Sequence, residues 1–206
     1  MALPFVDQPR TIGDRLGDVF LLLPALLSRL DEIKSPDDDP GLKADANLLL
    51  SELEGMHDFF QADMKADVDS FANSEEFKNN PMLVVMKLLI SMLHHTAVVL
   101  VASVSYKLNS WSLMDSVTMA ARCAAILKQV NEVLSMNIDG LFAGVVTSLM
   151  VVVIWSPIAE QRESARKILQ WRKDEKGLED CLNTLIVDSI QYGQKPAHTW
   201  VEISSE

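Results

Sequence analysis

The segment that decides the fold is MLVVMKLLISMLHHTAVVLVASVS, at residues 82–105. It is apolar on every side of a helix and carries two adjacent histidines, His94 and His95, near its middle. A helix that is hydrophobic all round either spans a membrane or lies at the centre of a helical domain. Lys87 and the histidines would be costly within hydrocarbon, and no Lys/Arg cluster flanks the segment to provide a positive-inside signal. We therefore predict the buried centre of a helical domain.

The composition indicates an acidic globular chain. Its 206 residues suit one domain, and 49% of them are hydrophobic. The formal net charge of −11 argues against nucleic acid as a partner, because phosphate binding needs clustered Lys and Arg. Residues 31–80 hold 14 acidic and four basic side chains, so this arm accounts for most of the excess charge.

Cysteine usage and the N-terminus predict a cytoplasmic protein, or a nuclear one if its role is regulatory. Cys123 and Cys181 belong to no metal-spaced pair, which fits a reduced compartment better than a disulfide scaffold. The opening MALPFVDQPR lacks the charged and apolar regions of a secretory signal, and we expect a complete product from Met1. The second apolar run, residues 141–155, is too short to cross a bilayer.

Helical spacing runs through almost the whole sequence. In the acidic arm, about residues 41–76, apolar side chains recur at steps of four and three: Leu42, Ala46, Leu49, Leu53, Met56 and Phe60. We predict one all-α domain over residues 1–206, a bundle of about seven helices around a buried central helix at about 82–107. The other helices are expected near 11–30, 42–60, 112–135, 138–155, 156–176 and 178–191, with an irregular tail at about 192–206.

Several segments resemble the regulatory (fungal-specific) domain of fungal zinc-cluster transcription factors. RTIGDRLGDVFLLLPALLSRLDEI at 10–33 resembles its helix leading into a "lPglL" turn, and LHHTAVVLVASV at 93–104 resembles its central helix. VTMAARCAAI at 117–126 is similar to its "C..AAr.I" helix, and GLFAGVVTSLMVVVIW with SARKIL is similar to its closing helix pair. The resemblance implies a helical domain that senses small molecules.

The departures from that family bear on function. Val117 stands where the family usually has cysteine, and Ala102-Ser103-Val104 stands where an "hRP" motif often follows. The sequence has neither a Cys₆ zinc cluster nor a basic arm, so DNA binding is not implied. What the resemblance implies is a ligand-binding module without the family's DNA-binding module.

His94, His95 and Tyr106 are the candidate catalytic residues. Histidine serves as acid, base or hydrogen-bond donor near neutral pH, and any of the three side chains could donate a hydrogen bond to a substrate carbonyl. Adjacent helix positions point about 100° apart, so at most one histidine faces a given cavity, and a metal shared by both is disfavoured. The alternative is a pair of core histidines hydrogen-bonded to neighbouring groups.

Methionine and tryptophan side chains are the candidate walls of an apolar pocket, since they adapt to an irregular ligand. The alternative for each is plain core filling. The predicted substrate-binding residues are Met86, Met92, Trp111, Met119, Met150 and Trp155.

The remaining motifs give little indication of a functional site. Asp37-Asp38-Asp39 is reminiscent of the magnesium motif of terpene cyclases but lacks a partner motif, so a solvated acidic loop is expected. Ser-His-Asp order, phosphate loops, HExxH and CxxC are all missing from the sequence. We therefore expect no metal and no cofactor.

These observations favour a hydrophobic small molecule as the ligand. The first hypothesis is a cofactor-free, pericyclase-like cyclase or isomerase that templates a terpenoid or polyketide of fungal secondary metabolism, because orientation alone can remove several kcal/mol of barrier. The second is a non-DNA-binding regulatory or ligand-sensing protein. A third is a degenerate relic or an assembly subunit. We expect no nucleic acid and no membrane span, and a homodimer is left open.

Overall fold

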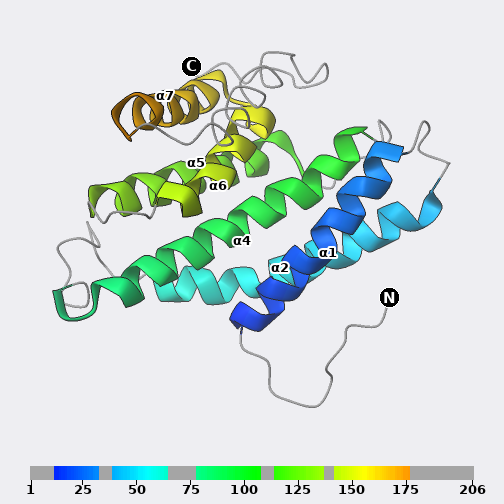
Figure 1. The fold of residues 1–206 in the computed structure, drawn as a ribbon. Helices are drawn as coiled ribbons and strands as arrows, with labels where there is room; N and C mark the ends of the chain where they lie inside the picture. The colour runs from blue at the N-terminus through cyan, green and yellow to red at the C-terminus, as the bar shows by residue number, and fades with distance from the viewer. Residues whose placement is uncertain (1–11, 33–38, 65–77, 108–113, 137–141, 177–206) are drawn as a thin grey trace. The chain divides into compact units, whose positions relative to one another are not determined.

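The computed structural model describes residues 12–32, 39–64, 78–107, 114–136 and 142–176, and most of these residues form helices (Figure 1). The helices are α1 (Ile12–Glu32), α2 (Pro40–Met64), α4 (Pro81–Lys107), α5 (Ser116–Ser135), α6 (Phe142–Trp155) and α7 (Ala159–Lys176). No strand occurs in these ranges, so the all-α class is confirmed. The helix predicted at 178–191 and the tail at 192–206 lie outside the described residues.

The chain divides into two compact units, and the division falls within α4. One unit comprises residues 1–66 and 100–113, and the other comprises residues 67–99 and 114–206. The single domain expected from the sequence stays a prediction.

The first unit holds α1 and α2 side by side (Figure 1). On α2 the predicted apolar seam is confirmed over its described side chains, because Leu42, Ala46, Leu49, Leu53 and Met56 are all buried. On α1 the buried side chains follow the same helical spacing: Leu16, Val19, Leu23, Leu26 and Leu30. Each helix thus turns one apolar stripe inward, as amphipathic helices do.

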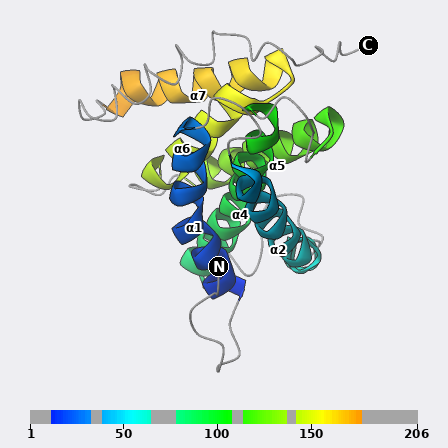
Figure 2. The same cartoon turned by 90° about the vertical axis from the view of Figure 1, so that its right-hand side faces the viewer.

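The second unit holds α5, α6 and α7 in mutual contact, and Figure 2 shows α7 lying against the other two. The first nineteen residues of α4 belong to this unit. Asn80 caps α4 by accepting a hydrogen bond from the Leu83 backbone N–H at 3.2 Å, and Pro81 occupies the first helical position, where its missing N–H costs nothing.

Two helix starts differ from the predicted ones. α5 begins at Ser116, not near Ser112, because Asp115 is its N-cap and accepts a hydrogen bond from the Thr118 backbone N–H at 2.7 Å. α7 begins at Ala159, two residues after the expected proline, since Ser156 Oγ bonds the Ile158 N–H at 3.2 Å and holds that segment in a turn.

One helix among the described residues is long and apolar enough to cross a membrane, judged by length and composition alone. It covers Pro81–Ser103, and 67% of its most apolar stretch is buried within the structure. The core helix of a soluble protein passes the same test.

The Asp115 N-cap makes the stability of the protein depend on pH in the acidic range. Hydrogen bonds from the Thr118 backbone N–H and hydroxyl lower the pKa of Asp115 below its ordinary value of 3.8. The stabilisation is therefore fully present above pH 3.8 and is lost as the pH falls through the folded-state pKa. We expect Asp115→Ala to lower the melting temperature at neutral pH, and the difference from wild type to shrink below pH 3.8.

The measurement is thermal unfolding by circular dichroism across this pH range. Asp115→Asn is the matched control, since asparagine is also a good N-cap and its amide does not titrate here. A wild-type advantage over Asp115→Ala that is unchanged at low pH would contradict the proposed role of the carboxylate.

Candidate functional site

Polar side chains lie within the apolar helix α4, and three of them, Ser91, His95 and Thr96, contact polar side chains of α5 or α6. Ser91, His95 and Thr96 are at most 3% exposed. Ser91 Oγ accepts a hydrogen bond from Gln129 Nε2 at 2.8 Å. Thr96 Oγ1 lies 2.8 Å from Ser148 Oγ and donates to the Met92 carbonyl at 2.8 Å. Because an unpaired buried polar group is costly, these bonds fix the register in which α4 packs against α5 and α6.

His94 and His95, the predicted catalytic pair, lie in this polar cluster. Their ring centroids are 5.4 Å apart with planes at 63°, an edge-to-face arrangement. Arg122 Nη1 lies 3.3 Å from His95 Nδ1. Arginine can only donate, so Nδ1 accepts and the ring proton of neutral His95 is on Nε2. The contact therefore places a guanidinium group of α5 against the buried imidazole of α4.

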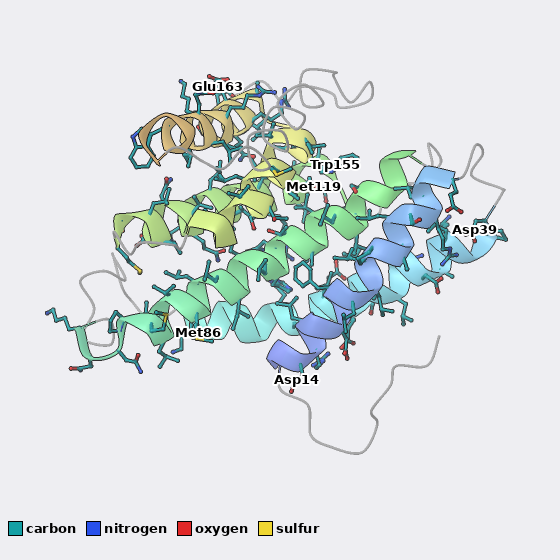
Figure 3. The ribbon with its side chains drawn as sticks, viewed as in Figure 1. Asp14, Asp39, Met86, Met119, Trp155 and Glu163 are labelled. Carbon is teal, nitrogen blue, oxygen red and sulfur yellow. The ribbon has the colours of Figure 1, made fainter. Side chains whose placement is uncertain are left out.

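The other predicted residues are dispersed. Met92 and Met119 are fully buried, as core residues are, whereas Met86 is 52% exposed and lies near the start of α4 (Figure 3). Met150 and Trp155 are half-buried. Figure 3 places Met119 and Trp155 at the same end of the α5–α6 pair. Trp111 and the Tyr106 side chain lie outside the described residues.

Cys123 on α5 is a buried thiol with little reactivity. Burial raises its pKa to about 12, an effect that its hydrogen bond with Ser156 only partly offsets. Since the thiolate is the nucleophile, this cysteine is not a candidate for covalent chemistry at neutral pH.

A groove between α1 and α2 is the candidate binding site that the sequence reasoning missed. It has a volume of about 280 Å³. Its apolar lining residues are Val19, Leu22, Ala25, Leu26, Leu48 and Leu49. Its charged lining residues are Arg15, Asp18, Arg29, Asp45 and Glu52. None of the predicted site residues is among them.

Ion pairs between the two helices flank this groove. Arg15 Nε contacts Glu52 Oε1 at 2.7 Å. Arg29 donates two parallel hydrogen bonds to Asp39, from Nε to Oδ2 at 2.7 Å and from Nη2 to Oδ1 at 2.8 Å. Its Nη1 donates a further hydrogen bond to Asp45. These bonds raise the pKa of Arg29, and the Arg29 bonds lower the pKa of Asp39. Both guanidinium groups are therefore charged and paired with carboxylates, and Arg29 uses all three of its nitrogens in doing so.

Asp39 corrects one expectation from the sequence. The aspartate run was predicted to be a solvated loop, yet Asp39 accepts a bond from the Leu42 backbone N–H at 3.0 Å and binds Arg29. It joins the start of α2 to the end of α1 (Figure 3). The signal in the sequence was the position of Asp39 directly before Pro40, a typical N-cap followed by a first-turn proline.

Among the described residues, no group of three or more His, Cys, Asp or Glu side chains is arranged to hold a metal ion.

The Thr96–Ser148 pair offers a direct test of the polar cluster. Both side chains are fully buried. We expect Thr96→Val to lower the free energy of unfolding by about 1–3 kcal/mol, because the Ser148 hydroxyl loses its partner. The double variant with Ser148→Ala should cost less than the sum of the single variants.

Urea unfolding measures these differences. Thr147→Val, at the exposed neighbouring position on α6, is the matched control and should change stability by no more than about 0.5 kcal/mol. Strict additivity of the two buried substitutions would show that the pair contributes no coupling.

Comparison with known proteins adds no relative: no family model, no curated protein and no solved structure matches this chain.

Proposed function

We propose that the protein binds an apolar small molecule in the α1–α2 groove. The observation that carries the proposal is the groove itself, a hollow of about 280 Å³ with a mainly aliphatic wall and five charged residues. Small-molecule sites combine these features, apolar surface for affinity and a few polar groups for orientation. Leu48, on its lining, is 60% exposed, which is costly for a leucine that nothing covers.

For the ligand class we propose a terpenoid or polyketide of fungal secondary metabolism, and for the reaction a cofactor-free cyclisation or isomerisation. The resemblance of the sequence to the fungal regulatory domain supports the ligand class. The absence from the sequence of a nucleophile–base motif fits a reaction driven by conformational templating.

His94, His95 and Tyr106 remain the proposed catalytic residues. The supporting observation is the Arg122–His95 contact, which places a cationic side chain beside a buried imidazole. The finer architecture also belongs to the proposal: about seven helices around α4 as the buried centre. The uninterrupted burial from Ala97 to Val99 and at Val101 to Ser103 supports it.

The second candidate function is regulatory: a ligand-sensing protein without DNA binding, located in the cytoplasm or nucleus. The net charge of −11 and the resemblance to a transcription-factor domain support it. The same groove would then hold an effector.

Ala25→Trp tests the groove. Ala25 lines it and is solvent-exposed, so an indole there fills the hollow without entering the core. We expect wild type to bind the neutral fluorescent probe N-phenyl-1-naphthylamine, and Ala25→Trp to weaken binding at least about tenfold, about 1.4 kcal/mol. Ser28→Trp, an exposed position on α1 outside the groove lining, should bind as wild type does. Equal binding by all three proteins would remove the groove as the site.

A gene deletion in the host separates the two functions. Metabolites and pathway transcripts are measured in the same cultures, with complementation by wild type, Ala25→Trp and His95→Ala. Intact transcripts with accumulation of an uncyclised precursor would indicate an enzyme, and rescue by His95→Ala would exclude this histidine from catalysis. Collapse of the transcripts together with all intermediates would indicate the regulator.

A further inference from the structure

The groove between α1 and α2 carries an excess of negative charge. Its lining includes two arginines but three carboxylates, those of Asp18, Asp45 and Glu52. Asp39, which lies outside the lining, adds a fourth negative charge through its bonds to Arg29. At neutral pH the groove and its immediate surroundings are therefore net anionic.

The two arginines are committed to these carboxylates. Arg15 uses Nε for Glu52, and Arg29 uses three of its nitrogens for Asp39 and Asp45. At Arg29 an anionic ligand would have to displace a carboxylate that is already in place, and at Arg15 it would meet a charge that Glu52 already balances. An arginine without such partners would instead be a ready site for carboxylate or phosphate.

Acceptor capacity, in contrast, remains in the groove. A carboxylate offers about four lone-pair sites on two oxygens. Glu52 and Asp45 each use one oxygen in their bonds to arginine. They lie seven residues apart on α2, about 10 Å along the helix axis, and Leu48 and Leu49 of the apolar lining fall between them. The groove thus presents apolar surface bounded at both ends by hydrogen-bond acceptors.

We infer that the groove selects an apolar molecule bearing an ammonium group over the same molecule bearing a carboxylate. This inference rests on the proposed function, and it specifies the polar end of the ligand. The apolar body lies against the leucines, and the ammonium donates to Glu52 or Asp45. A hydroxyl in place of the ammonium gives intermediate affinity, because it donates a hydrogen bond but gains nothing from the charge.

Displacement of N-phenyl-1-naphthylamine from the full chain tests the inference. The competitors are decylamine, decanol and decanoate, which share one chain and differ in headgroup, used below their micelle concentrations at neutral pH. We expect decylamine to displace the probe at a concentration at least about fivefold lower than decanoate, with decanol between them. Added salt should reduce the ratio of the displacing concentrations of decanoate and decylamine, since the groove carboxylates are partly exposed and salt screens their charge.

Two variants make the test specific. Glu52→Gln keeps an amide oxygen for Arg15 but removes the charge, and should reduce the decylamine preference several-fold while leaving decanol unchanged. Glu54→Gln, an exposed carboxylate on α2 outside the groove lining, removes the same charge and should leave the preference intact. Asp18→Asn gives a second groove variant should Glu52→Gln fail to fold.

The outcomes separate the two proposals. Probe binding with decanoate equal to or better than decylamine would overturn the inference and leave the groove as the binding site. No probe binding by the folded wild type would overturn the proposed function, and the inference with it. An equal loss of preference in Glu52→Gln and Glu54→Gln would attribute the selectivity to overall charge and so contradict the inference.

Discussion

The constraint on which the second unit depends is the burial of polar groups within an apolar helix. α4 carries a serine, two histidines and a threonine over residues 91–96, all nearly or fully inaccessible to solvent. A hydrophobic surface alone specifies no register, because one aliphatic contact can replace another at little cost. Directional bonds do: Ser91 must meet Gln129, and Thr96 must meet Ser148. The apolar side chains then pack around that alignment.

Ion pairs have the corresponding role in the first unit, at lower energetic cost and with more solvent. Each partner in these pairs is about one-third exposed, so each pair contributes little to stability by itself. Their contribution is geometric. Arg15 near the start of α1 pairs with Glu52, and Arg29 near its end pairs with Asp45, which comes earlier on α2. These two pairs therefore hold the helices antiparallel. The apolar side chains left between these pairs form the groove.

The two candidate sites differ in the kind of chemistry that they offer. The histidine cluster is buried, and its contacts include the edge-to-face packing of the two rings and the Arg122–His95 contact. For this cluster the core interpretation and the catalytic one predict the same contacts. The groove is open, and its side chains are available to a ligand at the surface. For this reason the binding proposal rests on the groove, while catalysis by the histidines is a separate proposal with its own test.

The sequence by itself determined the all-α class, most helix ends and the buried stripe of α2, because helical periodicity, capping residues and proline positions are local properties. It placed Pro81 at the start of α4 correctly. It misplaced the starts of α5 and α7, where the Asp115 cap and the Ser156–Ile158 hydrogen bond set the first helical residue. Only the tertiary structure decided the groove. Its lining comes from two helices, and Leu22 and Leu48 look like ordinary surface positions until the partner helix is in place. The pairing of Arg29 with Asp39 and Asp45 likewise joins residues 10 and 16 positions apart, a separation at which no local pattern specifies a contact.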